Sequence, residues 1–299
     1  MDYAPRKYAL VTGAASGMGR IYAEKLAALG FGLLLVDINA PALEETASLA
    51  RKAVPQSLAD RAPATAQGAS SVIPTDDRRA EGEDLLRGVF TAVVDLTAAD
   101  AAEKVREAAD AAGITVDVLI NNAGMLFLSD ICDTSSEKLR KMMALHCVTP
   151  LLLCHEFIPG MKERGWGRVL NISSRTSEMA FPLLGMYGNT KHFVKSYSKE
   201  LRIECRGSGV SVTVVSFGAV DTPLFGFNDK QRRFLKAVGA MITPEKAVTK
   251  ALRAMFKGRK SLTPGFLNRL VTVLPPLAPD WLISALVRRF GGTLTSMQK

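Results

Sequence analysis

The sequence is poor in the residues that build disulfide frameworks and metal sites. Its 299 residues include four cysteines and three histidines. No two cysteines form a Cys-x-x-Cys pair, and the histidines are not spaced as metal ligands. We therefore expect no metal site and no disulfide, and we interpret the cysteines as reduced thiols of a cytoplasmic protein.

Long hydrophobic runs are also absent. No uninterrupted apolar run is long enough to span a bilayer. The first ten residues, MDYAPRKYAL, lack the apolar segment of a secretory signal. Aromatic residues make up only 7% of the chain, beside 47% hydrophobic and 22% charged residues. This composition is typical of a soluble globular α/β protein.

Positive charge gathers towards the C-terminal end. From Asp229 onward there are fourteen Lys or Arg residues and three Asp or Glu residues, a net charge of +11, whereas the whole chain carries +9. Such a region can meet nucleic acid, an anionic membrane surface or an acidic substrate. Because no nucleic-acid-reading motif accompanies it, we expect no nucleic-acid partner.

Apolar segments alternate with amphipathic ones along the first two thirds of the chain. Runs without strict polar alternation predict buried strands over 8–13, 31–37, 89–97, 116–124, 167–174 and 210–218. Helical patterns separate the first four, over 18–30, 40–53 and 98–113. With right-handed crossovers, this order predicts an α/β fold with a doubly wound parallel sheet.

We expect one large domain over residues 1–260, followed by an amphipathic C-terminal extension over 261–299. Pro275, Pro276 and Pro279 divide that extension into two short helical pieces, which can pack on the protein, cap a substrate pocket or make peripheral membrane contact. An irregular stretch at about 54–86 is predicted as a surface insertion, and 222–243 as a lid.

A glycine-rich turn follows the first predicted strand. In TGAASGMGR, Gly13 lets the chain turn, while Gly17 and Gly19 remove side chains where backbone must approach a pyrophosphate or a strand. Asp37 ends the second strand, eighteen residues after Gly19. A carboxylate there can accept both hydroxyls of an adenosine ribose and would repel a 2′-phosphate, which favours NAD over NADP. The alternative is an ordinary solvated acid at a strand end.

The stretch YGNTK places Tyr187 and Lys191 four residues apart. In a helix the two side chains would share one face, which also fits a simple solvated surface. A free tyrosine has a pKa of about 10. A cation one turn away favours the phenolate, so we expect Lys191 to lower the pKa of Tyr187 towards the range of a useful acid/base.

In their order along the chain, four motifs resemble the short-chain dehydrogenase/reductase (SDR) family: Thr12-Gly13-x-x-x-Gly17-x-Gly19, Asn121-Asn122-Ala123-Gly124, Ser174 and Tyr187-x-x-x-Lys191. The resemblance covers roughly residues 7 to 225. It implies a Rossmann fold and an NAD(H)-dependent oxidoreductase that interconverts a secondary alcohol and a ketone. It also implies a homodimer or homotetramer, for which the apolar helical pattern over 136–165 offers an interface.

The resemblance also implies roles for single residues. Tyr187 would be the catalytic acid/base, Lys191 would lower its pKa and bind the nicotinamide ribose, and Ser174 would orient the substrate carbonyl. The implied cofactor-binding residues are Gly13, Ser16, Gly17, Met18, Gly19, Asp37, Ile38, Asp95, Leu96, Asn122, Ala123, Gly124, Tyr187, Lys191, Val220 and Thr222.

Two positions depart from the family pattern. His146 stands where the family usually has an asparagine that holds a water beside the lysine, and Phe217 stands where it usually has proline. Because imidazole both donates and accepts and has a pKa near neutrality, we predict that His146 takes over the proton relay. The alternative is a buried structural histidine. Phe217 puts the shape of the following loop in doubt.

The residues before the tyrosine predict the kind of substrate. Apolar side chains gather there: Met179, Phe181, Leu183, Leu184 and Met186. They favour a bulky, largely apolar small-molecule substrate, hydroxysteroid-like or 3-oxoacyl-like. Two alternatives stay open: a dinucleotide sensor that has lost the chemistry, and a peripheral-membrane lipid reductase.

Overall fold

The computed structural model of the chain describes residues 7–55, 88–178, 184–222 and 241–264, together with a few isolated positions between 224 and 285. Most of the predicted insertion, lid and C-terminal extension lies outside the described residues. The domain boundaries drawn from the sequence therefore stay predictions.

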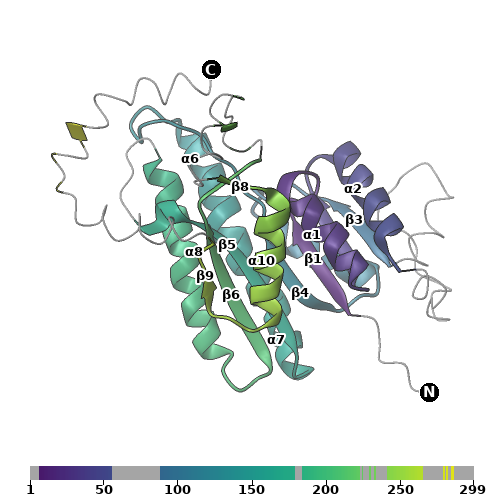
Figure 1. Cartoon of the computed structure of the whole chain (residues 1–299). Helices are drawn as coiled ribbons and strands as arrows, with labels where there is room; N and C mark the ends of the chain where they lie inside the picture. The colour runs from purple at the N-terminus through teal and green to yellow at the C-terminus, as the bar shows by residue number, and fades with distance from the viewer. Residues whose placement is uncertain are drawn as a thin grey trace, which may run out of the picture. The chain divides into compact units, whose positions relative to one another are not determined.

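The strands form one seven-stranded sheet in the order β3-β2-β1-β4-β5-β6-β9 (Figure 1). Its members are β1 (Tyr8–Thr12), β2 (Gly32–Asp37), β3 (Val89–Val93), β4 (Val116–Asn121), β5 (Gly167–Ser174), β6 (Val210–Phe217) and β9 (Ser261–Leu262). The pairs β1–β2, β1–β4, β2–β3 and β6–β9 are all parallel. The predicted doubly wound parallel sheet is thus confirmed. A second, two-stranded sheet joins β7 (Ala219–Val220) to β8 (Met241–Ile242).

The helices occupy the predicted gaps between strands. They are α1 (Gly17–Ala28), α2 (Ala40–Ala53), α5 (Ala101–Ala111), α6 (Ser136–Met143), α7 (Thr149–Glu163), α8 (Gly185–Glu204) and α10 (Pro244–Phe256). A π-helical segment, η1 (Ala144–Val148), separates α6 from α7, and a 3₁₀ turn, η2 (Arg175–Glu178), follows β5. By length and composition Ser136–Glu163 could cross a membrane, and half of its apolar window is buried in the fold; a single helix of this kind is weak evidence for a membrane span.

The chain divides into two compact units. The first contains Met1–Ala123, Thr149–Leu170 and Cys205–Ser211, and the second contains Gly124–Val148, Asn171–Glu204 and Val212–Lys299. In the first unit, α1 and α2 lie side by side against β1, β2 and β3 (Figure 1). The strand order reverses between β1 and β4, so the first unit contains the switch point at which ligands of such sheets bind.

In the second unit, polar contacts fix α8 against β5. Asn171 Nδ2 donates to Ser198 Oγ at 2.9 Å, Ser173 Oγ donates to the Lys191 carbonyl at 2.8 Å, and Lys191 Nζ donates to the Ile172 carbonyl at 3.1 Å. These donors and acceptors are buried. Because an unmade buried hydrogen bond costs about 1–3 kcal/mol, the contacts fix the rotation of α8 about its axis.

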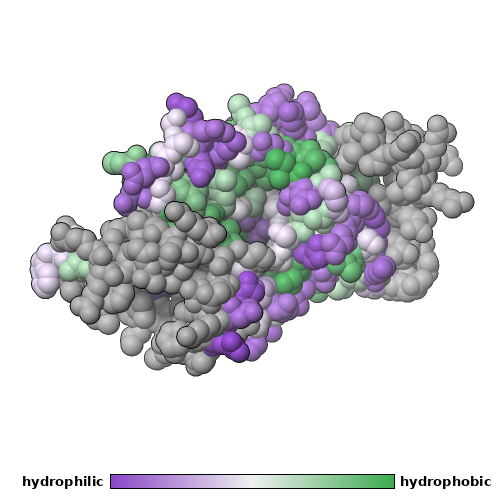
Figure 2. All heavy atoms as spheres, turned by 90° about the horizontal axis from the view of Figure 1, so that it is seen from above, coloured by the Kyte–Doolittle hydropathy of each residue, from purple (hydrophilic) through white to green (hydrophobic). Residues whose placement is uncertain are grey.

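Both polar and apolar residues reach the described surface. On the face drawn in Figure 2, hydrophilic residues (purple) cover large areas, and hydrophobic residues (green) gather in smaller patches. Among the large apolar side chains that are exposed, Ile38 follows β2, and Phe193 and Ile203 lie ten residues apart on α8. Scattered exposure of this kind is normal for a protein surface and carries no functional argument.

Candidate active site

In the glycine turn of the first unit, backbone segments pack directly against one another with no side chain between them. Gly13 has φ +66° and Gly17 φ +55°, in the left-handed region that favours glycine. A Cβ on Gly19 would lie 1.9 Å from the Gly13 carbonyl oxygen, so any side chain there would push α1 off the turn. The N-terminus of α1 is therefore held close to the end of β1, as an anion-binding helix start requires.

A set of hydrogen bonds ties this turn to the end of β4. Thr12 Oγ1 accepts from the backbone N–H of Asn122 at 3.0 Å and of Ala123 at 3.1 Å. Asn122 Nδ2 in turn donates to the carbonyls of Thr12 at 3.0 Å and Gly13 at 3.2 Å. The residues predicted to bind the cofactor did not include Thr12. Its position as the first letter of the glycine motif was the available signal.

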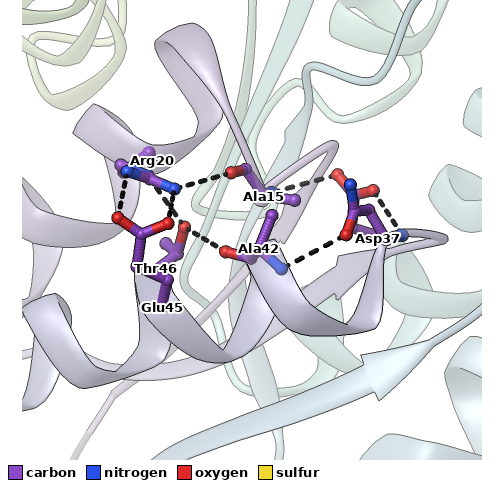
Figure 3. A network of polar contacts seen from close by, with 7 residues as sticks. Ala15, Arg20, Asp37, Ala42, Glu45 and Thr46 are labelled. Atoms are coloured by element: carbon purple, nitrogen blue, oxygen red, sulfur yellow. Dashed lines mark hydrogen bonds and ion pairs between the residues drawn. The ribbon is translucent and has the colours of Figure 1, made fainter.

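Asp37 is oriented by the backbone around it. Ala15 N donates to Asp37 Oδ2 at 3.0 Å, and Asn39 N donates to Asp37 Oδ1 at 3.0 Å (Figure 3). The carboxylate is thereby held at the C-terminal end of β2, beside the glycine turn. This is the place from which an acid can accept the hydroxyls of an adenosine ribose.

On the other side of Ala15 lies a cation, the Arg20 guanidinium. Its Nη1 and Nη2 donate to the two carboxylate oxygens of Glu45 at 3.0 and 2.8 Å. Nε donates to Thr46 Oγ1 at 3.2 Å, and Nη2 also donates to the Ala15 carbonyl at 3.2 Å (Figure 3). Arg20 thus links α1 to α2, and its charge is offset by Glu45.

The other predicted cofactor residues of the first unit lie at strand and helix ends. Ser16 precedes α1 and is exposed, and Ile38 after Asp37 is 62% exposed. Asp95 Oδ1 accepts from Thr97 N at 2.9 Å, which shapes the turn after β3. Two further predicted cofactor residues of the first unit are Met18 and Leu96. Met18 is half-buried in α1, and the Leu96 carbonyl accepts from Thr149 Oγ1 at 2.8 Å.

The second unit holds the predicted catalytic residues together. Tyr187 and Lys191 lie one turn apart on α8, and Lys191 Nζ is 5.6 Å from the centroid of the Tyr187 ring. The Tyr187 hydroxyl is hydrogen-bonded to Ser174, the last residue of β5. All three residues are buried. The prediction that Tyr187 and Lys191 share a helix face is confirmed, and they do not lie on a solvated surface.

Burial changes the acidity of both groups. It raises the pKa of Tyr187 to about 12, and the hydrogen bond with Ser174 opposes this rise. It lowers the pKa of Lys191 to about 8. The pKa of Tyr187 is therefore raised and not lowered as predicted, because loss of solvent disfavours the phenolate more strongly than the Ser174 hydrogen bond favours it. The phenol is protonated at neutral pH.

His146 lies in η1 with both ring nitrogens in hydrogen bonds. Nε2 accepts from the Met125 backbone N–H at 2.9 Å, and Nδ1 lies 2.9 Å from Thr190 Oγ1. Burial, followed by the charge of Lys191, lowers the pKa of His146 well below its ordinary value. A Cβ on Gly124 would lie 3.3 Å from His146 Nε2 and 3.7 Å from Lys191 Nζ. Glycine at this position therefore lets the backbone pass close to both side chains.

The remaining predicted positions of the second unit are partly described. Val220 is buried in β7, and the Thr222 backbone N–H donates to its carbonyl at 2.7 Å. Phe217 ends β6 as a buried side chain, which explains how an apolar residue is accommodated there. Among the predicted pocket residues, Leu184 and Met186 are half-buried, and Met179, Phe181 and Leu183 lie outside the described residues.

Comparisons with known proteins agree with this arrangement. A family model described as short chain dehydrogenase matches residues 63–233, which include Ser174, Tyr187 and Lys191. The very-long-chain 3-oxoacyl-CoA reductase of Bos taurus is 27% identical over 294 residues, 96% of this chain and 80% of that protein. The 17-beta-hydroxysteroid dehydrogenase type 3 of Danio rerio is 25% identical over 277 residues, 90% and 77% of the two chains.

A solved structure from a study of 7β-hydroxysteroid dehydrogenase stereoselectivity shares the fold. Its TM-score is 0.73 at 24% identity, with 95% of this chain and 96% of that chain covered. The chain belongs to the short-chain dehydrogenase/reductase family, whose members bind a nicotinamide dinucleotide. It is an oxidoreductase that acts on a hydroxyl or keto substrate.

Proposed function

We propose that the protein is an NAD(H)-dependent oxidoreductase that interconverts a secondary alcohol and a ketone on a bulky, largely apolar substrate. The observation that carries the proposal is the buried group of Ser174, Tyr187 and Lys191. Burial of an ammonium costs free energy, which a catalytic role would explain. Groups whose pKa is strongly shifted in this way cluster at functional sites.

The residues of the first unit fit a dinucleotide. A Cβ at Gly13 would lie 2.8 Å from Ala123 Cα, and one at Gly19 would strike the turn, so glycines let the turn and the start of α1 pack as closely as a dinucleotide-binding turn requires. Asp37 would hold the adenosine ribose and repel a 2′-phosphate. The neighbouring cation, Arg20, is already bound to Glu45, so it offers little attraction to that phosphate. These contacts support NAD over NADP.

Tyr187, Ser174 and Lys191 would handle the proton. The nicotinamide, when bound, supplies or accepts the hydride. In the reducing direction Tyr187 donates its proton to the substrate oxygen, and the Ser174 hydroxyl hydrogen-bonds the same oxygen. Lys191 then stabilises the Tyr187 phenolate that this proton transfer produces. With a pKa of about 8, Lys191 is still mostly charged at neutral pH and can do so.

The substrate proposal rests on the apolar residues around Tyr187 and on the relatives. Two of these relatives are named as a very-long-chain 3-oxoacyl-CoA reductase and a 17-beta-hydroxysteroid dehydrogenase. Leu184 and Met186, half-buried beside Tyr187, suit the apolar body that both substrate classes have in common. We extend the proposal to a cytoplasmic homodimer or homotetramer, with peripheral membrane contact through residues 261–299 as the variant for a lipid substrate.

A substrate screen tests the proposal. Purified full-length protein is mixed with NADH or NADPH and with a panel of 3-oxoacyl-CoA thioesters and ketosteroids of increasing chain or ring size. We expect NADH consumption, matched by alcohol formation, with at least one bulky member and little with small ketones. Tight NADH binding without turnover of any panel member would favour the dinucleotide sensor instead.

A further inference from the structure

The hydrogen bonds around His146 define which nitrogen carries its proton. The Met125 N–H donates to Nε2, so Nε2 presents a lone pair. The Thr190 hydroxyl donates its own hydrogen to the Tyr187 carbonyl at 2.8 Å, so Thr190 Oγ1 can only accept from Nδ1. Both sides of the ring therefore require the same form, a neutral imidazole with its hydrogen on Nδ1.

This ring is badly placed to pick up a second proton. A hydrogen on Nε2 would point at the Met125 N–H, where two donors would face each other. The charged and titratable groups around it are Lys191 and Tyr187 from α8 and Cys147 from η1, none of which would stabilise an imidazolium. His146 is also only 1% exposed. While Nε2 accepts from Met125 and Nδ1 donates to Thr190, the ring cannot take up a proton at one nitrogen and release one from the other.

We propose that His146 and Thr190 form a positioning pair, which holds the first turn of α8 through the chain Met125 N–H, His146, Thr190 hydroxyl and Tyr187 carbonyl, and that His146 is not a proton relay. The anchor acts on the backbone of Tyr187 itself. It therefore fixes the phenol relative to Ser174 on β5, which belongs to the same unit.

The pair has a physical reason to be effective. Thr190 directly precedes Lys191, so one contact restrains the turn that carries both catalytic side chains. His146, Thr190 and Tyr187 are buried and the contact with Met125 is partly buried, so these hydrogen bonds are strong and an unmade one is costly. Substitution of either His146 or Thr190 breaks the same series of hydrogen bonds and releases the same turn. The losses of activity caused by the two substitutions should therefore not add.

Kinetics can separate positioning from relay, on the best substrate of the screen described above. We expect His146→Phe and Thr190→Val each to lower kcat about tenfold, with little change in KM or in the pH profile. The double variant should be no worse than either single one, and Thr190→Ser should restore the rate. His155→Gln, at an exposed histidine, and Thr249→Val, which loses an exposed hydroxyl bond to the Glu245 carbonyl, are the matched controls.

Two results would overturn the proposal: additive losses in the double variant, or a changed pH profile in His146→Phe beside an unaffected Thr190→Val. The kinetic test rests on the proposed function, so a second measurement does not use turnover. Nitrogen-15 NMR of the histidine rings, assigned with His146→Phe, should show a neutral Nδ1–H ring from pH 6 to 9. An Nε2–H ring, or titration in that range, would refute the positioning pair even if no substrate were found.

Discussion

The two candidate sites of the molecule are built from different materials. Around the glycine turn of the first unit, the contacts are made mostly by backbone: N–H groups orient Asp37 and Thr12, and glycines remove side chains. In the second unit, buried side chains make the site, and their acidities are shifted. The first arrangement is suited to holding a phosphate-bearing ligand and the second to moving a proton.

This difference predicts how each site fails. A site built from backbone should lose its function when a substitution adds side-chain atoms, because it depends on the close approach of backbone segments. A site of buried titratable groups should fail through changed charge, and its stability should depend on pH. The variants below probe one site or the other.

Removal of the buried ammonium should have the largest effect. Because the folded pKa of Lys191, about 8, lies below the unfolded value of 10.5, the unfolded chain holds more protons between those pH values. The contribution of Lys191 to the free energy of unfolding therefore rises with pH from 8 to 10, by up to about 3 kcal/mol. In Lys191→Met this rise should disappear. Urea titrations of both proteins across this range measure it, and parallel pH curves would contradict the account.

Cys147 and Tyr187 oppose this rise at the upper end of the window. Burial raises the pKa of Cys147 from 9.0 to about 11, so its contribution to stability falls as pH rises from 9 to 11. The pKa of Tyr187 is raised to about 12, so the unfolded tyrosine loses its proton first above pH 10. Its contribution to stability falls as pH rises from 10 to 12, which opposes the effect of Lys191.

Ser174→Ala tests the neighbour of the phenol. The hydrogen bond with Ser174 lowers the pKa of Tyr187, so its loss should raise that pKa further. Loss of one donor to the reacting oxygen should also reduce kcat about 100-fold. The pH profile of kcat and ultraviolet titration of the tyrosines measure the two effects. Ser136→Ala, at an exposed serine, is the control; equal rates in the two variants would refute the role of Ser174.

Gly19→Ala against Gly113→Ala tests the backbone-built site. A Cβ at Gly19 meets the Gly13 carbonyl, whereas one at Gly113 (φ +62°) meets nothing within 4 Å. We expect Gly19→Ala to abolish NADH binding and to cost about 2 kcal/mol of stability. Gly113→Ala should cost about 1 kcal/mol, from its left-handed backbone alone, and should bind normally. Fluorescence titration with NADH would reveal unchanged binding in Gly19→Ala, contrary to this view.

The smallest expected effects concern cofactor choice. Asp37→Asn removes the charge that faces a 2′-phosphate and should shift the NADPH-to-NADH affinity ratio about tenfold towards NADPH. Glu45→Gln leaves Arg20 less neutralised and should shift the same ratio by about threefold, in the same direction. Paired titrations with the two cofactors measure both. A ratio that is unmoved in Asp37→Asn would remove the argument for NAD.

The sequence predicted six of the seven strands of the main sheet and the helices between them, because buried parallel strands leave uniform apolar runs. It could not predict β9, since two residues at an edge carry no periodic pattern. Nor could it predict η1, because a π-helical segment preserves the apolar character of the helix pattern around it. Both β9 and η1 are short, local departures from the apolar patterns on which the sequence predictions rest.

The candidate catalytic residues could be predicted from the sequence motifs, but their acidities could not. A pKa depends on burial, and sequence spacing alone placed Lys191 near Tyr187 without showing how little solvent either would keep. Thr190 and Met125 were missed for a similar reason, since their contacts with His146 join residues 44 and 21 positions apart.

The most direct test measures binding and turnover on one preparation of Tyr187→Phe. If the phenol is the proton donor, NADH should bind as it does to the unaltered protein, while ketone reduction falls by about a thousandfold. Turnover at an unchanged rate would show that the proton comes from elsewhere and would contradict the account.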